Sequence, residues 1–164
     1  MMFKRFLTAL LLSLSVLPLH AAAVSFLVVE TGLQEGQGAS QYSSLYESGL
    51  LDIFFEAGHI VSNAPILRLS GAPKQAFPEE ARPDLAEALA GGMEYFILAQ
   101  LDYAVPAGEK IEKPHNVFLR IFAVNPCRLI YEQRYGGQAL PTLDDEYLEV
   151  KQRARSLIAH LNDR

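Results

Sequence analysis

The chain has 164 residues, half of them hydrophobic, with 14 basic and 19 acidic side chains. This length suits a single ordinary domain. The net charge of −5, which no basic cluster offsets, argues against nucleic acid and against an anionic membrane surface as partners.

Residues 1–23 have the pattern of a secretory signal peptide. Lys4 and Arg5 precede an almost wholly apolar run over residues 6–19, and alanines at 21–23 supply the small residues of a cleavage site. The run has about 14 residues against the ~20 that span a bilayer, so an uncleaved membrane anchor is the weaker interpretation. We expect cleavage after residue 23, one α/β domain over residues 24–164, and no membrane span after cleavage.

The only cysteine is Cys127, so an internal disulfide is impossible. Val24 and Ser25 follow the predicted cleavage bond, where a lipoprotein would carry its lipid-attachment cysteine. We therefore expect a periplasmic protein without a lipid anchor. The place of Cys127 beside the Asn125-Pro126 turn fits either an inert, half-buried thiol or an intermolecular disulfide.

The mature chain opens with a predicted strand and helix. Residues 24–30 (VSFLVVE) form a dense apolar run typical of a buried strand. A helix is predicted from residue 40 or 43 to residue 57, because Ser44 and Glu47 have capping-box spacing and Gly58 suits the position after a helix end.

A second strand and helix follow. The strand is predicted at 59–63, with a possible extension through Ile66 and Leu67. The helix is predicted at 78–90, where proline and acidic residues suit its start and Gly91 suits its end. Helical crossovers after both strands indicate parallel pairing there.

Three strands rich in β-branched and aromatic residues are predicted at 95–105, 116–124 and 128–135. Asn125-Pro126 is a turn signal between the last two, and the three should form an antiparallel meander. One face of these strands is wholly apolar and the other mixes phenylalanine with polar side chains. A sheet covered by helices on both sides explains this pattern best.

The last helix is predicted from about residue 144 to 162. Its apolar face has 3- and 4-residue spacing and consists of Tyr147, Val150, Ala154, Leu157, Ile158 and Leu161. Asp144, Asp145 and Glu146 are best explained as charges at a helix start. The predicted fold class is α/β, with a single mixed sheet of about five strands in the order β-α-β-α-β-β-β-α and helices packed on the sheet.

Four segments carry a resemblance to a known family. They are VSFLVVE, FFEAGHIV, AEALAGGMEYFILAQLDY and FLRIFAVNPCRLIYEQRYGG, which together cover much of the mature chain. They are similar to the periplasmic α/β domain shared by the curli secretion channel, the lipoprotein activators of peptidoglycan synthases and the N-terminal domain of the Tol-system β-propeller protein. The resemblance implies a periplasmic domain that acts with other envelope proteins. The channel's pore-forming strands have no counterpart here.

An enzyme is the main alternative. Residues 31–38 (TGLQEGQG) match the glycine loop of short-chain dehydrogenases, and Tyr147 and Lys151 mimic their catalytic pair. However, Glu35 places a negative charge where a pyrophosphate would bind, and the chain is far shorter than those enzymes. We therefore predict no enzyme activity and no cofactor, and keep a small periplasmic enzyme using residues 32–38 as the alternative.

No metal site and no catalytic residue are predicted. His59, His115 and His160 are scattered and lack the spacing of metal ligands. No G-x-S-x-G motif occurs, and Cys127 has no recognisable base partner.

The leading hypothesis is a non-catalytic periplasmic binding or adaptor domain that acts with another cell-envelope protein. A self-assembling structural subunit is a further alternative, and the oligomeric state stays open. The polar loops at 32–40 and 106–114, with the neighbouring histidine, look least committed to the core, either as recognition loops or as tolerated insertions. The predicted partner-binding residues are Gly32, Glu35, Gly36, Gly38, Glu109, Lys110, Glu112, Lys113 and His115.

Overall fold

The computed structural model describes residues 21–33, 41–104, 113–136 and 140–161. These residues form a six-stranded sheet and three α-helices. The strands are β1 (Ala23–Thr31), β2 (Ile60–Asn63), β3 (Leu67–Leu69), β4 (Tyr95–Asp102), β5 (Asn116–Ala123) and β6 (Arg128–Gly136). The helices are α2 (Gln41–Glu56), α3 (Arg82–Ala90) and α4 (Leu143–Ile158). The predicted α/β class is confirmed.

The sheet is mixed, with the strand order β2-β1-β4-β5-β6. β2 pairs with the first half of β1, and β3 pairs with its last residues. β1 runs parallel to β2, β3 and β4, as the crossover helices predict. β4, β5 and β6 form the predicted antiparallel meander, and Asn125-Pro126 lies in the turn between β5 and β6. β1 is therefore an interior strand, which agrees with its dense apolar sequence.

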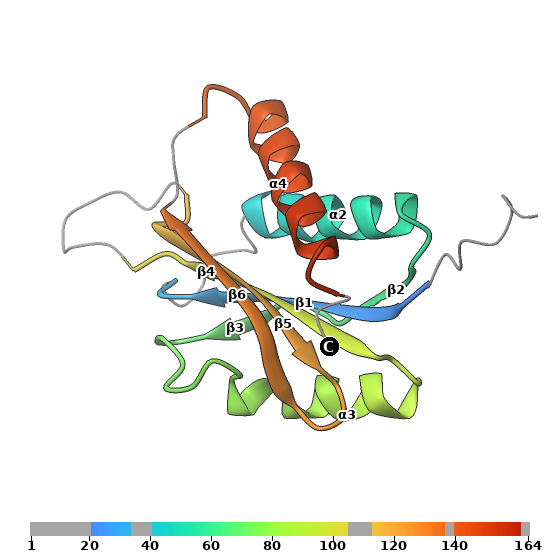
Figure 1. Cartoon of the computed structure of the whole chain (residues 1–164). Coiled ribbons are helices and arrows are strands. Elements are labelled where there is room, and N and C mark those ends of the chain that lie inside the picture. Colours follow the sequence, from blue (N-terminus) through green and yellow to red (C-terminus); the bar gives the residue numbers. More distant parts are fainter. Residues whose placement is uncertain (1–20, 34–40, 105–112, 137–139, 162–164) are drawn as a thin grey trace, which may run out of the picture.

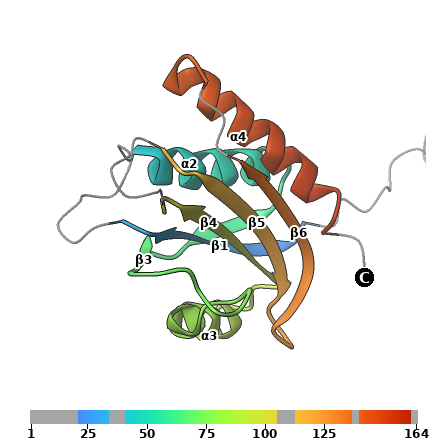
Figure 2. The same cartoon turned by 90° about the vertical axis from the view of Figure 1, so that its left-hand side faces the viewer.

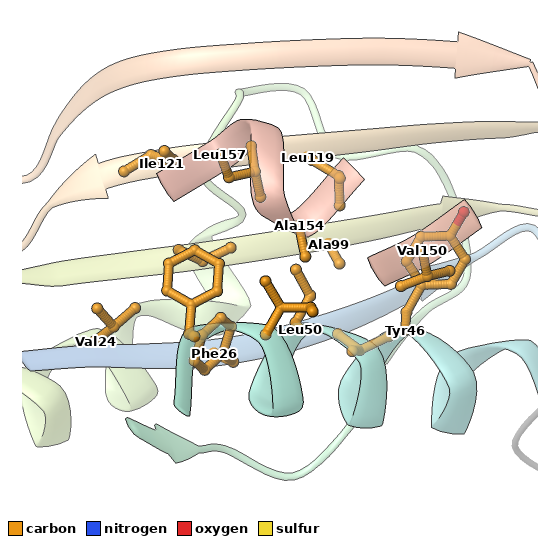
Figure 3. Packing of buried hydrophobic residues seen from close by; sticks show 14 of the residues in the cluster. Val24, Phe26, Tyr46, Leu50, Ala99, Leu119, Ile121, Val150, Ala154 and Leu157 are labelled. Atoms are coloured by element: carbon orange, nitrogen blue, oxygen red, sulfur yellow. The ribbon is translucent and has the colours of Figure 1, made fainter. Parts of the chain in front are cut away.

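Helices cover both faces of the sheet: α2 and α4 lie on one side and α3 on the other (Figures 1 and 2). The larger core lies between the sheet and the pair α2 and α4. Figure 3 shows Phe26 of β1, Leu50 of α2, Leu119 of β5 and Leu157 of α4 directed into this layer, and all four are buried. Such close-packed apolar contact supplies most of the stability of a domain of this size.

A smaller core lies under α3. Leu27 and Phe96 of the sheet are buried there together with Leu85 of the helix. The chain before α3 closes this core, because the ring of Phe77 lies 5.0 Å from that of Phe122, in an edge-to-face arrangement.

Polar side chains on the α3 side of the sheet are paired with one another. Arg120 of β5 is buried and donates to the Gln100 carbonyl oxygen of β4 at 2.8 Å. It also forms an ion pair with Glu132 of β6. The mixture of phenylalanine and charge that the sequence shows on this face is therefore a hydrogen-bonded network, as buried polar groups require.

Three local predictions differ from the structure. The second strand is split into β2 and β3 around Pro65, which has no N–H to continue a ladder. The capping box was wrong: α2 begins at Gln41, so Ser44 lies inside the helix, and Glu47 instead accepts a hydrogen bond from Asn63 at 2.6 Å. The second helix begins with a 3₁₀ turn, and α3 proper starts at Arg82, with a proline in its first turn.

The last helix ends at Ile158, about four residues before its predicted end, whereas other helix termini follow their sequence signals. Gly58 has φ of 84°, as expected after α2. Thr142 caps α4 by accepting the Asp145 N–H at 3.1 Å, and the helix begins at Leu143, one residue before the predicted start. Within the described ranges, no helix combines the length and hydrophobicity needed to cross a bilayer.

Candidate functional site

The two predicted partner-binding loops follow β1 and β4. These strands are parallel neighbours, and their C-terminal ends lie together at one rim of the sheet (Figure 1). The strand ends are bonded to each other. The Tyr103 N–H donates to the Thr31 carbonyl at 2.9 Å, and the Thr31 hydroxyl donates to the Asp102 carboxylate at 3.2 Å. The chain returns beside them at His115, whose N–H donates to the Asp102 carbonyl at 2.7 Å. The structure therefore joins, at one rim, segments that are about 70 residues apart in sequence.

We call residues 31–32, 102–104 and 113–116 the loop edge. Three predicted partner-binding residues, Gly32, Lys113 and His115, lie there. The other six, Glu35, Gly36, Gly38, Glu109, Lys110 and Glu112, lie outside the described residues.

Gly32 is required by the close approach of the two strands. Its φ is 77°, and a β-carbon at this position would lie 2.6 Å from the Ala104 backbone nitrogen. Both the left-handed backbone and the lack of space exclude a side chain.

Gly32→Ala is expected to lower the free energy of unfolding by about 2 kcal/mol, from backbone strain plus the displacement of Ala104. Gly92→Ala is the matched control, because Gly92 has φ of 75° but open space around its β-carbon position. This control should cost about 1 kcal/mol, from strain alone. Chemical denaturation of both variants measures the difference, and equal losses would show that the close approach is unimportant.

Beside the loop edge lies a cavity of about 50 Å³, between α2, α4 and the ends of β5 and β6 that face the loops. We call it the tyrosine cavity. Its polar lining includes Tyr46, Lys113, Tyr135, Glu146, Glu149 and Arg153.

Two tyrosines from different layers meet in this cavity. The hydroxyls of Tyr46 on α2 and Tyr135 on β6 lie 2.7 Å apart, and either can donate to the other. Burial raises the pKa of both Tyr46 and Tyr135 above the usual range for tyrosine, so both stay neutral at physiological pH. One hydroxyl donates its hydrogen to the other. The hydrogen of the accepting hydroxyl has no acceptor among the residues that the structure describes.

Arg153 of α4 closes the cavity against this pair. Its guanidinium carbon lies 3.5 Å from the centre of the Tyr135 ring, and its Nη2 donates to Glu149 at 2.6 Å. Its Nε is buried and has no hydrogen-bond partner in the described part of the chain. A buried donor without an acceptor costs about 1–3 kcal/mol, so an arrangement of this kind points to a group that is supplied from elsewhere.

The dehydrogenase interpretation does not fit the geometry around α2. The place where a phosphate would meet the helix N-terminus is next to Glu30, a buried carboxylate of the chain itself. Glu30 accepts hydrogen bonds from Ser43, in the first turns of α2, and from Arg68 Nε at 2.8 Å. Donors near this helix end are therefore already used by a carboxylate of the chain itself.

The tyrosine–lysine pair is also not arranged for catalysis. Tyr147 is half-buried and not a core residue; it donates to Asp52 of α2, and this hydrogen bond raises the pKa of Tyr147. A dehydrogenase needs the opposite shift. Lys151 is bound to Glu56 at 3.0 Å. The pair therefore links α4 to α2 through two polar contacts.

The remaining candidates are the histidines and Cys127. No group of three or more histidine, cysteine or acidic side chains could hold a metal among the described residues. Cys127 is exposed, and desolvation raises the pKa of its thiol, which disfavours the reactive thiolate. His160 stacks on Tyr131, with ring centres 3.8 Å apart.

The tyrosine cavity was not predicted from the sequence. In the sequence, Tyr46 lies among the apolar residues of its helix, and Arg153 lies between Lys151 and Arg155 without forming a basic cluster. A signal was nevertheless present: Arg153 falls between the apolar positions Val150 and Ala154, close to the buried side of α4.

No protein-family model matches the chain, and no curated protein matches its sequence. Solved structures with a similar fold include the PelC dodecamer from Paraburkholderia phytofirmans, at 13% identity and a TM-score of 0.48, over 80% of this chain and 84% of that one. The LpoB C-terminal domain from Escherichia coli has 10% sequence identity and a TM-score of 0.43, over 77% of this chain and 90% of that one. TolB from Acinetobacter baumannii has 11% sequence identity and a TM-score of 0.39, over 82% of this chain and 26% of the TolB chain. They match the predicted resemblance, but similarities this remote carry no information on function.

Proposed function

We propose that this protein is a non-catalytic periplasmic binding domain that docks on another cell-envelope protein through the loop edge and the tyrosine cavity. The observation that supports this most is that the described residues flanking both polar loops lie beside the cavity at one rim of the sheet. The predicted signal peptide supports the placement in the envelope.

The composition of the rim favours protein recognition. Tyrosine and arginine dominate the energetic centres of protein interfaces, and Tyr46, Tyr135 and Arg153 meet here in one partly buried cluster. Lys113 forms no ion pair with any described residue, so its charge is free for a partner. A rigid sheet that presents such groups beside polar loops is a common design for a recognition surface.

The test is site-specific photo-cross-linking of the exported protein in its own host. A photoreactive residue at Lys113 or His115 should cross-link one envelope protein. The same residue at Leu89, which is exposed on α3 across the sheet, is the matched control and should not. Each variant should keep the melting temperature of the parent protein.

The partner found in this way should then bind the purified protein in solution. Cross-links only to further copies of the chain would contradict docking and favour the self-assembling subunit. Equal cross-linking from all three positions would contradict the loop edge as the docking surface.

A further inference from the structure

We propose that the tyrosine cavity binds the side-chain carboxylate of an aspartate or glutamate of the partner protein. This inference rests on the proposed docking function and names the chemistry that the partner must present.

The residues that line the cavity carry donors for which the described residues supply no acceptor. These are the buried Nε–H of Arg153, one hydroxyl hydrogen of the Tyr46–Tyr135 pair, and the ammonium group of Lys113. The ligand must therefore bring acceptors. A carboxylate has two acceptor oxygens, and its hydrogen bonds with guanidinium and ammonium groups are stronger than those of a neutral carbonyl.

The two glutamates of the lining are already engaged. Glu149 accepts from Arg153 Nη2 at 2.6 Å, and Glu146 accepts from the Leu140 N–H at 3.3 Å. Arg153 thus has one nitrogen committed inside the chain and keeps Nε available. Glu149 is paired with Arg153, whereas Glu146 keeps its charge in the same lining as the ammonium of Lys113. A further carboxylate would therefore be held by charge-assisted hydrogen bonds and not by a surplus of positive charge.

The size of the cavity separates a side-chain carboxylate from a chain terminus. At about 50 Å³ it exceeds the roughly 10–15 Å³ that a single water needs. It has room for a carboxylate on an unbranched methylene stem. A C-terminal carboxylate would bring its branched Cα and the preceding peptide group into the same space.

Three acetylated tripeptides test the source of the acceptor: acetyl-Gly-Glu-Gly-amide, its glutamine analogue, and acetyl-Gly-Gly-Gly with a free C-terminus. Binding to the full exported protein is followed by the NMR signal of the Arg153 Nε–H. The glutamate peptide should shift this signal saturably at millimolar concentration. The glutamine peptide should bind about tenfold more weakly.

Matched variants test whether the response comes from binding in the cavity. Arg153→Gln should abolish the response, which is then followed at the backbone amide of Lys113, whereas Arg155→Gln, on the exposed side of the same helix, should leave it unchanged. If Arg153→Gln fails to fold, Lys113→Gln at the cavity rim provides the second test and should weaken binding.

Several results would overturn the inference. An equal response to the glutamine peptide would show a site for neutral acceptors. A stronger response to the peptide with the free C-terminus would show that the cavity binds a chain terminus and not a side-chain carboxylate. No response to any peptide would mean that the cavity holds water alone. A failure of the proposed docking function alone would look different. The glutamate peptide would still bind, but cross-linking from the loop edge would capture no partner.

Discussion

Phe54→Ala is expected to lower the free energy of unfolding by about 3–5 kcal/mol, which is a large part of the stability of an ordinary domain. Phe54 of α2 is fully buried, and its ring meets that of Phe26 edge to face, with centres 5.1 Å apart. Alanine would remove this contact and leave a cavity between helix and sheet. Chemical denaturation at neutral pH measures the loss.

The neighbouring residue provides the control. Phe55 is 72% exposed, so Phe55→Ala removes the same atoms without opening a cavity and should change the free energy of unfolding by less than about 0.5 kcal/mol. Similar losses in the two variants would contradict the described orientation of α2.

Raising the pH from 9 to 11 is expected to lower the free energy of unfolding by nearly 3 kcal/mol through the Tyr46–Tyr135 pair alone. In the unfolded chain a tyrosine ionises near pH 10, whereas burial raises the pKa of Tyr46 and of Tyr135 in the folded protein. Above pH 10 the unfolded state therefore releases two protons that the folded state keeps. Each contributes about 1.4 kcal/mol over this interval, and the contribution vanishes below about pH 9.

Denaturation curves at a series of alkaline pH values measure this fall. The double variant Tyr46→Phe/Tyr135→Phe should show a shallower alkaline decline than the parent, because phenylalanine cannot ionise. An identical pH profile for the double variant and the parent would show that the two phenols ionise without opposing the fold.

Periodicity explains why most of the fold follows from the sequence. The dense apolar run of β1 and the 3- and 4-residue spacing of α4 each identify an element by the face that it must bury. Turn residues then limit how the elements connect, so the parallel half and the antiparallel half of the sheet are both predictable. The capping box at Ser44 was wrong because local capping signals compete with the packing of a whole helix. The second strand is broken at Pro65 because proline has no N–H for the ladder.

The candidate site follows from the sequence only in part. The two loops could be singled out because polar segments after β1 and β4 stand out against apolar strands, but the meeting of their flanking residues at one rim was not predicted. The tyrosine cavity was not, because its polar groups come from α2, β6, α4 and the chain before β5. Each of these side chains fits an ordinary role on its own element. Only their meeting in space leaves Arg153 Nε without an acceptor.

The interior position of β1 has a consequence for the order in which the chain can fold. β1 is synthesised before every other strand, yet Val24 pairs with Tyr95 and Ala23 with Ile60. β5 and β6, in contrast, are joined by the turn at 124–127 and can pair as soon as they are made. Until β4 is available, the apolar β1 segment has no partner on that side and is the part of the nascent chain most prone to aggregate. A chain that stops before β4 would therefore hold its most hydrophobic strand at an open edge.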